Sequence, residues 1–280
     1  MGRSRLYLRK LDSPPSTIFE HLVSHFPKIP AEVWRDRLAR GAVTAEGECI
    51  TEKSPYRHGI TIQYDREVVA EPASGESETI LYQDSAILVV DKPHGMPVTP
   101  AGDYVKRSLL YRLQEQTGLQ DLAPVHRLDR ETAGLVLFSV NPATRGHYHQ
   151  LFSENQVSRE YLAVARPPNS STKEWLVETR IAGGSPWFTQ RIIEGPVNAI
   201  TRIELIEMRE EFAVFRLKPQ TGKKHQLRVH MMSIGAPIVG DPYYPTVREK
   251  APGEPPLQLL AHRLAFENHT FKSGRKLSRG

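Results

Sequence analysis

Residues 126–139 read His-Arg-Leu-Asp-Arg-Glu-Thr-Ala-Gly-Leu-Val-Leu-Phe-Ser, a charged loop that leads directly into an apolar stretch. The apolar part, 135–140, predicts a buried strand. Charged residues beside a buried strand are typical of loops that a rigid scaffold holds in place. Asp129 lies between Arg127 and Arg130, and nearby positive charge favours an ionised carboxylate. Such a carboxylate can act as a nucleophile. The alternative interpretation is a surface loop in which acids and bases merely pair.

Apolar strands and helix-like patterns alternate irregularly along the rest of the chain. We expect strands at 79–82, 86–90, 161–165 and 259–264, and a hairpin over 203–218 with its turn at 209–211. We expect helices at 106–117 with Gly118 as the stop, after Asn141 as N-cap with Pro142 at the first position, and around 227–234 with its end at Gly235. This irregular order indicates an α+β fold rather than a regular βαβ succession.

The N-terminal region forms a separate part of the chain. Thr17 and Glu20 have capping-box spacing, a second helix is expected over 31–40, and short strands are expected at 42–44 and 60–64. The following stretch is poor in apolar residues and contains Pro, Gly and Ser, as linkers do. We therefore expect a small α/β domain at 1–70, a linker at 71–79 and a larger domain at 80–280.

Composition narrows the class of protein. The 280 residues are 39% hydrophobic and 25% charged, which is typical of a globular protein. The formal net charge of +5 indicates either many surface Lys and Arg residues or binding to a ligand with a phosphate backbone. The single cysteine, Cys49, excludes a disulfide within the chain and a thiolate metal cage. No signal-peptide pattern or bilayer-length apolar segment is present, so we expect a soluble cytoplasmic protein.

A second motif, 220–230, combines a turn, two lysines and an amphipathic helix. Lys223 and Lys224 precede the helix, and lysines near helix N-termini attract phosphates. Arg228 lies one position off the apolar row of the helix and is expected to point along its edge into a cleft. A basic surface helix is the alternative, more for the lysines than for Arg228.

Two further features are less specific. His225 and His230 are five residues apart, which is not the spacing of a helical zinc pair, so hydrogen bonding or contact with a ligand is favoured over a metal site. Tyr161 begins an apolar strand, where an aromatic residue is usually part of the core or its rim. Its other use is to stack on a flipped base, a contact of roughly 1–3 kcal/mol.

Taken in order, these segments resemble the RluA family of pseudouridine synthases over about residues 80–266. DKPHGMPV at 91–98 is similar to the family's "NKP.G..V", and 126–139 to "HRLD..TSGLLL". REYLAVA at 159–165 is similar to "K.YLA.V", 219–244 to "P.TGR.HQIRVHL...GHPI.GD..Y", and 260–266 to the closing strand. The chain differs from this pattern at Asp91 (usually Asn), Ala133 (usually Ser) and Arg159 (usually Lys).

The N-terminal region also resembles a domain of known type. Residues 34–44, followed by Glu46 and Gly47, are similar to the "I..G.V.VNG" segment of the S-four-type RNA-binding domain, which often precedes this catalytic domain. The acidic Glu46 and Glu48 differ from a strongly basic RNA-binding surface.

The resemblance implies a fold and an activity. The fold is α+β, with a mixed, mainly antiparallel sheet and flanking helices. The activity is isomerisation of a uridine to pseudouridine in structured ribosomal or transfer RNA, by a monomer without cofactor or metal. Asp129 would be the nucleophile, attacking either the base or the sugar. Tyr161 would stack on the base and help remove the final proton, and Arg228 would pair with Asp129.

Base flipping and RNA contact are implied for a second set of residues. Arg127 would occupy or stabilise the space that the extruded uridine leaves, and Leu227 would pack beside the pocket. The full set is His126, Arg127, Leu227, Lys223, Lys224 and His225.

Three other functions are compatible with parts of the sequence. An RNA-binding protein without activity fits the charge but leaves the joint presence of Asp129, Tyr161 and Arg228 unexplained. If HRLD at 126–129 were a kinase-like catalytic loop, the chain would also need a Gly-rich loop, a strand lysine and a downstream DFG, which are not found together. A glycosidase using Asp129 with Glu131 or Asp121 would release free uracil.

Overall fold

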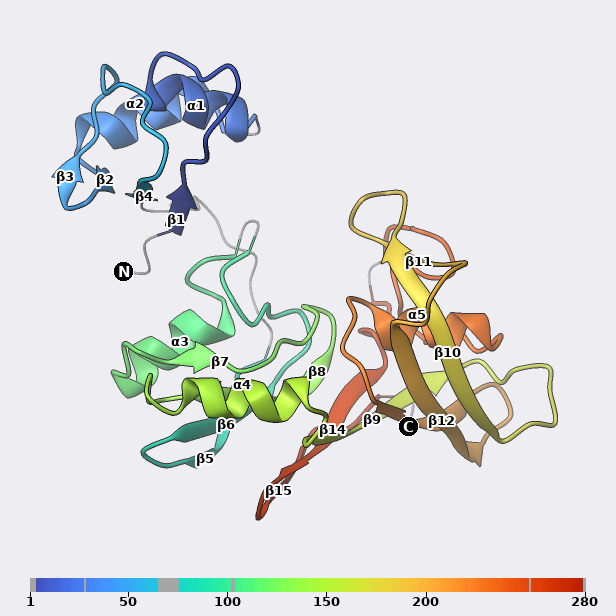
Figure 1. Ribbon diagram of the computed structural model, residues 1–280. Helices are drawn as coiled ribbons and strands as arrows, with labels where there is room; N and C mark the ends of the chain where they lie inside the picture. The colour runs from blue at the N-terminus through green and yellow to red at the C-terminus, as the bar shows by residue number, and fades with distance from the viewer. Residues whose placement is uncertain (1–3, 28, 65–75, 102–103, 252, 279–280) are drawn as a thin grey trace. The chain divides into compact units, whose positions relative to one another are not determined.

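The structure, a computed structural model, describes residues 4–27, 29–64, 76–101, 104–251 and 253–278. The chain divides into two compact units, Met1–Ala70 and Glu71–Gly280, each of which is described by itself (Figure 1). Of the expected linker at 71–79, residues 71–75 lie outside the described residues, and Thr79 already begins a strand.

In the N-terminal unit two helices pack on a small antiparallel sheet. The helices are α1 (Ile18–His25) and α2 (Ala31–Ala39); the strands are β1 (Ser4–Tyr7), β2 (Val43–Ala45), β3 (Glu48–Cys49) and β4 (Thr61–Tyr64), in the order β1-β4-β2-β3. The capping box is confirmed, because the Thr17 side chain accepts from the Glu20 amide at 3.2 Å while the Glu20 carboxylate accepts from the Thr17 amide. Trp34, at the centre of the core, is fully buried.

The larger unit is built on a long sheet. Within the described residues its order is β11-β10-β12-β13-β9-β14-β8-β6-β5, with β15 paired to β14 and β7 to β8. The strands are β5 (Thr79–Gln83), β6 (Ile87–Lys92), β7 (Ala123–Pro124), β8 (Ala133–Ser139), β9 (Ser158–Ala165), β10 (Glu174–Gly183), β11 (Gln190–Ile193), β12 (Ala199–Met208), β13 (Ala213–Pro219), β14 (Leu259–Phe266) and β15 (His269–Lys272). Every pairing except β14 with β8 is antiparallel, so the α+β class with a mainly antiparallel sheet is confirmed.

The helices of the larger unit are α3 (Leu109–Thr117), α4 (Arg145–Ser153) and α5 (Gln226–Ser233). Gly118 ends α3 with a left-handed φ of 73°, as expected, although α3 starts at Leu109 rather than at residue 106. The prediction that Asn141 caps the next helix is wrong. Its side chain accepts from the Ala143 amide at 2.9 Å, which forms a local turn, and α4 begins only after Thr144.

The two parts of the sheet meet at β8 and β14. This parallel contact has only two register pairs, Leu260 with Ala133 and Ala261 with Gly134. Gly134 has a φ of 110°, and a Cβ atom there would lie 2.2 Å from the carbonyl oxygen of Ala261. Only glycine allows this close approach of the two backbones, and the approach fixes where the loop 126–132 leaves the sheet.

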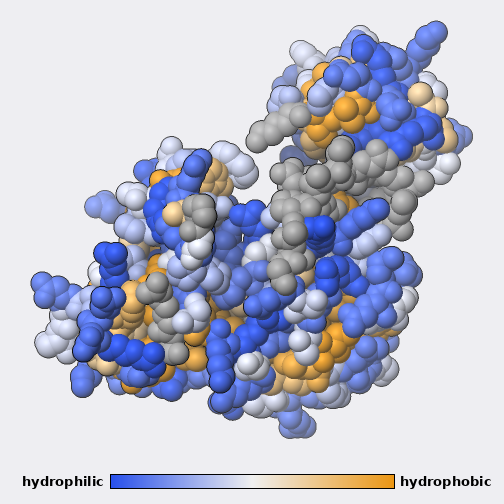
Figure 2. All heavy atoms as spheres, turned by 180° about the vertical axis from the view of Figure 1, so that it is seen from behind, coloured by the Kyte–Doolittle hydropathy of each residue, from blue (hydrophilic) through white to orange (hydrophobic). Residues whose placement is uncertain are grey.

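Strands β10 and β11 form an edge that the sequence analysis did not assign. Leu176 on β10 is 53% exposed, and the strand has no continuous apolar run. Hydrophilic side chains predominate on the face of the molecule drawn in Figure 2, with apolar side chains in separate patches. In the described part of the chain, every helix is too short or too polar to cross a bilayer.

Candidate active site

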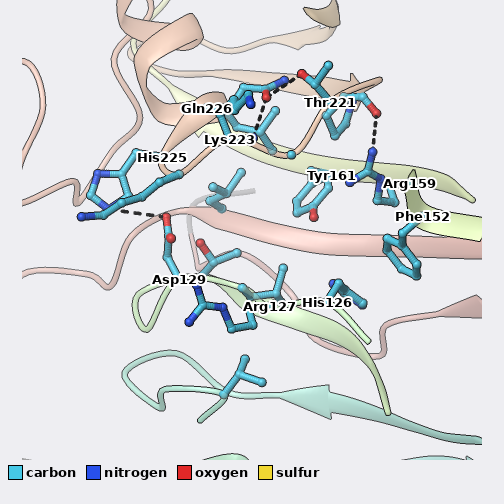
Figure 3. Close-up of a pocket in the computed structure, with 18 of the residues that line it drawn as sticks. His126, Arg127, Asp129, Phe152, Arg159, Tyr161, Thr221, Lys223, His225 and Gln226 are labelled. Carbon is cyan, nitrogen blue, oxygen red and sulfur yellow. Dashed lines mark hydrogen bonds and ion pairs between the residues drawn. The ribbon is translucent and has the colours of Figure 1, made fainter. Parts of the chain in front are cut away.

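A cavity of about 810 Å³ opens where the two parts of the long sheet meet. Its walls come from the loop after β7, from β9, from α5 with the loop before it, and from residues 97–101. All nine residues predicted to act in catalysis or RNA contact line it: His126, Arg127, Asp129, Tyr161, Lys223, Lys224, His225, Leu227 and Arg228. In Figure 3, Asp129 and His225 face each other on one side, and Tyr161 lies between them and the group His126, Phe152 and Arg159.

Two residues, Lys92 and His94, donate hydrogen bonds to the main chain of the loop that carries Asp129. The fully buried Lys92 donates to the carbonyls of Met96 and Arg130, at 2.7 and 3.3 Å, and His94 Nδ1 donates to the Glu131 carbonyl at 2.7 Å. Burial lowers the pKa of Lys92 to about 7, although nearby carboxylates oppose the shift. The resemblance placed Lys92 in a motif without a role, and the structure makes it an anchor of the loop.

Arg228 is fixed more firmly than any other charged group of the site. Its side chain is fully buried, and its Nε and Nη2 atoms donate to the two carboxylate oxygens of Asp241 at 2.8 and 2.5 Å. The guanidinium also lies 4.8 Å from the ring centre of Tyr243. The remaining nitrogen, Nη1, lies 3.4 Å from Asp129 Oδ2. The structure therefore brings Arg228 and Asp129 together, and Asp241, which received no role from the sequence, orients Arg228.

The carboxyl group of Asp129 is not controlled by the neighbours that the sequence suggested. Burial raises its pKa above the ordinary value; Arg228 only partly offsets this, and Glu131 raises it further. Arg127 is exposed, and Arg130 forms its ion pair with Glu131 at 2.8 Å. The expectation that Arg127 and Arg130 keep the carboxylate ionised is thus wrong in its cause, because the largest opposing positive charge comes from Arg228, a residue distant in the chain.

His225 faces the same carboxylate in a neutral form. Burial, together with Arg228 and Lys224, lowers its pKa to about 3. The Tyr244 hydroxyl oxygen accepts from the Gln190 amide at 2.7 Å and lies 2.8 Å from His225 Nδ1. The other ring nitrogen, Nε2, lies 3.9 Å from Asp129 Oδ2.

Tyr161 lies in the cavity wall with its ring half-buried. Burial raises the pKa of its phenol, and the charge of Asp129 adds to the shift while Arg159 opposes it. The phenol is therefore protonated at neutral pH. Arg159 lies beside it and is held by the carbonyls of Pro219 and Gln220, each at 3.4 Å.

His126 has partners within the protein. Its Nε2 accepts from the Leu137 amide at 3.1 Å, and its ring stacks on Phe152 with 4.7 Å between centres. Burial lowers its pKa to about 3, with Arg159 adding to the effect. These contacts hold the start of the loop against β8 and leave one edge of the ring toward the cavity, as Figure 3 shows.

The other predicted contacts differ in exposure. Arg127, Lys223 and Lys224 are exposed, and within the described ranges neither the Arg127 nor the Lys224 side chain forms a hydrogen bond or an ion pair. Leu227 is buried and belongs to the core around β9, β12 and β13. Because residues 226–231 of α5 are all buried, the alternative of a surface helix is wrong for Arg228, whereas Lys223 and Lys224, which precede the helix, are at the surface.

His230 serves the fold rather than the cavity. Fully buried, it contacts the hydroxyls of Thr179 and Thr201, each at 2.9 Å, and so joins α5 to β10 and β12. In the described part of the chain, no group of three or more His, Cys, Asp or Glu side chains is arranged to hold a metal ion.

The C-terminal residues are bound to the strand that leads into the site. Ser273 Oγ lies 2.8 Å from both carboxylate oxygens of the buried Asp91, and the Gly274 amide donates to Asp91 at 3.0 Å. Arg275 donates to the Asp91 carbonyl at 3.0 Å. The residues after β15 thus support β6 directly before Lys92.

Comparison with known proteins agrees with this geometry. Residues 86–233, more than half of the chain, match the family model described as RNA pseudouridylate synthase. An uncharacterized RNA pseudouridine synthase of Synechocystis is 28% identical over 86% of this chain and 82% of its own length. The yeast mitochondrial tRNA pseudouridine(32) synthase is 28% identical over 79% of this chain and 49% of its own length.

A solved structure shows the same fold. Human RNA pseudouridylate synthase domain containing 1 superposes with a TM-score of 0.60 at 26% identity, covering 74% of this chain and 86% of the human one. The matched region of the family model includes Asp129, Tyr161 and Arg228, which the cavity brings together. The chain therefore belongs to the RNA pseudouridylate synthase family and is an RNA-modifying isomerase.

Proposed function

We propose that the chain is an RluA-type enzyme that uses Asp129 as nucleophile to isomerise one uridine in a structured ribosomal or transfer RNA. The observation that carries this proposal is the position of the Asp129 carboxylate, inside the cavity and 3.4 Å from an arginine that is itself locked by Asp241. A positioned carboxylate beside a fixed cation is the arrangement that covalent attack by an aspartate requires.

The reaction needs a nucleophile, a means to hold the base, and a final proton transfer. Asp129 attacks either the ribose carbon that carries the base or the uracil ring, and the bond from nitrogen to sugar breaks. The base turns and rejoins the sugar through carbon, Asp129 leaves, the ring carbon loses its proton, and the released nitrogen gains one. Redox state and atoms are conserved, so the isomerisation has no need of a cofactor.

Arg228 serves this sequence by holding Asp129 in position and by stabilising its charge. Asp241 accepts two of the guanidinium hydrogen bonds, which leaves Nη1 as the part directed at Asp129. Since burial raises the pKa of Asp129, activity should fall on the acid side as the carboxylate becomes protonated, at a pH above the ordinary range for aspartate.

Tyr161 is assigned to stacking on the base in the cavity. Its raised pKa keeps the phenol protonated in the free enzyme, which favours a packing role over that of a resident base. Removal of the final proton by Tyr161 would require the substrate to change this ionisation.

Arg127 is assigned to the extrusion of the uridine. Base flipping costs a few kcal/mol, which contacts in the vacated stack must offset. Arg127 lines the cavity, is exposed, and has no side-chain partner among the described residues, so its guanidinium is available for RNA.

Lys223 and Lys224 are assigned to the phosphates of the RNA backbone. Both are exposed on the cavity wall ahead of α5, where neutralised phosphates would add salt-dependent affinity. His126, His225 and Leu227 shape the cavity for the flipped nucleotide.

The class of RNA and the role of the N-terminal unit complete the proposal. A relative named as a tRNA pseudouridine synthase supports transfer RNA as one substrate class, with ribosomal RNA as the other. We assign the N-terminal unit as an S-four-type RNA-binding domain of a monomeric cytoplasmic enzyme. Exposed Arg9 and Lys10 supply positive charge there, and replacing both with Glu should weaken RNA binding at low salt.

The test is pseudouridine mapping on total RNA from cells that lack the gene, complemented with wild type, Asp129→Asn or Asp121→Asn. One or more sites should disappear in the deletion and return with wild type but not with Asp129→Asn. Asp121→Asn, the same loss of charge at an exposed position that does not line the cavity, should retain activity. Restoration by Asp129→Asn would overturn the nucleophile assignment, and the restored sites identify the RNA class.

A further inference from the structure

An exposed tryptophan, not used above, lies beside Lys224, a residue of the cavity wall. Trp187 is 81% exposed, more than any other large apolar side chain that the structure describes as exposed. It lies in the loop 184–189 between β10 and β11. The Nζ atom of Lys224, which lines the cavity, is 5.9 Å from the centre of its ring. The indole therefore neighbours a residue that lines the cavity.

The loop that carries Trp187 is held by its own hydrogen bonds. The Thr189 amide and hydroxyl both donate to the Pro186 carbonyl, at 2.8 and 2.7 Å, and the Gly184 amide donates to the Thr189 carbonyl at 3.1 Å. A Cβ atom on Gly184 would lie 2.4 Å from Thr189 Oγ1, so the loop closes tightly at its base. Trp187 is thus presented by a defined turn.

The loop is also tied to the wall that fixes Arg228. The Phe188 ring packs on Tyr243, with 5.1 Å between centres, and the Gln190 amide donates to the Tyr244 hydroxyl at 2.7 Å. Phe188 therefore anchors the turn inward while Trp187 points outward. The turn that carries the indole is therefore attached to Tyr243 and Tyr244, whose rings also lie beside the Arg228 guanidinium.

We infer that Trp187 and Lys224 form a binding site for an unpaired nucleotide next to the uridine that is modified, an inference that rests on the proposed function. The indole offers a flat apolar face on which a base can stack, and Lys224, which has no ion-pair partner among the described residues, offers a cation for the adjacent phosphate. Unpaired bases stack on aromatic side chains regardless of base identity, whereas paired bases present no free face.

The test compares two probes and three variants in an Asp129→Asn background, which prevents turnover. The probes are a fluorescein-labelled RNA hairpin with a uridine-rich loop and a fully paired duplex of the same stem. Trp187→Ala should raise the Kd for the hairpin about tenfold, a change of about 1.4 kcal/mol, and leave the Kd for the duplex unchanged. Trp187→Phe should stay near the parent value. Leu176→Ala, which removes another exposed apolar side chain from β10, is the matched control and should leave both Kd values unchanged.

A spectroscopic readout tests stacking directly. The fluorescence of Trp187 is the difference in tryptophan emission between the parent and Trp187→Phe. Hairpin binding should quench this fluorescence and reduce its further quenching by acrylamide. Hairpin binding that leaves this emission unchanged, or a Trp187→Ala variant that binds both probes as the parent does, would overturn the inference. Neither result would affect the proposed function, which fails if no site depends on the gene in the mapping experiment or if Asp129→Asn still produces pseudouridine there.

Discussion

The two walls of the cavity are supported in opposite ways. On the α5 wall every polar group of Arg228 that points into the protein has a partner, and Asp241, Tyr243 and Tyr244 surround it. On the loop wall the main chain is anchored through Lys92, whereas the Arg127 side chain has no partner within the described residues. The difference indicates that the Asp129 carboxylate takes its position from α5, whereas the proposed function assigns the Arg127 side chain on the loop wall to RNA.

The largest effect should come from removing the partner of Arg228 on the α5 wall. Asp241→Ala leaves the Arg228 charge buried without its partner, and removing one member of a buried pair costs about 3–5 kcal/mol. We expect a loss of that size in the free energy of unfolding in urea. The control is Glu254→Ala, which removes an exposed ion pair with Arg248 and should cost about 1 kcal/mol or less. Equal losses in the two variants would contradict the contrast between the walls.

A substitution on the loop wall should change activity and leave stability unchanged. Arg127→Ala should leave the free energy of unfolding unchanged, because the side chain has no partner in the described structure. Its turnover of RNA should fall about 100-fold, since base flipping must then proceed without a contribution of a few kcal/mol. Single-turnover kinetics separate this effect from binding. A stability loss with unchanged turnover would assign Arg127 to the fold.

Lowering the pH should reduce the free energy of unfolding through His230, which joins α5 to β10 and β12. Its pKa is lowered by burial to about 4, so below the unfolded value of 6.5 the unfolded chain binds a proton that the folded chain does not. Stability is therefore complete above about pH 6.5 and should fall by about 2 kcal/mol between pH 7 and pH 5 from this residue alone. Urea unfolding of wild type and His230→Gln at both pH values measures the difference, and parallel losses in the two proteins would exclude His230 as the cause.

The smallest effect concerns the support beneath the loop wall. Ser273→Ala removes the hydroxyl contact with the buried Asp91 and should cost about 1–2 kcal/mol in the free energy of unfolding. Ser278→Ala, at the end of the same segment, is the control and should change nothing measurable. If Ser273→Ala also slows turnover, the influence of the C-terminal residues extends through β6 to the loop.

Local signals predicted much of the fold. The capping box at Thr17, the glycine stop after α3 and the hairpin of β12 and β13 follow from short-range rules and are present. Asn141 obeyed a different local rule and formed a turn instead of a cap. Strands β10 and β11 lie at an edge of the sheet with many exposed side chains, so neither shows the apolar run that identifies a buried strand.

The site was predictable in its members and less so in its electrostatics. All nine candidate residues line one cavity, because the resemblance located them by motif. The partner that holds Arg228, and the cause of the Asp129 pKa, depend on residues brought together from distant parts of the chain. Nothing in the sequence around Asp91 pointed to Ser273, which lies 182 residues later. Long-range pairs of this kind are settled by packing and not by spacing.

The close approach at Gly134 has a consequence for directed evolution. A library that randomises residues 126–135 should recover varied residues at several loop positions, since exposed side chains such as Arg127 tolerate change without loss of the fold. At position 134 it should return glycine alone, because any side chain would strike the backbone of Ala261 and force the sheet apart. Variants with new substrate preferences should therefore keep Gly134 and differ at the loop positions that precede it.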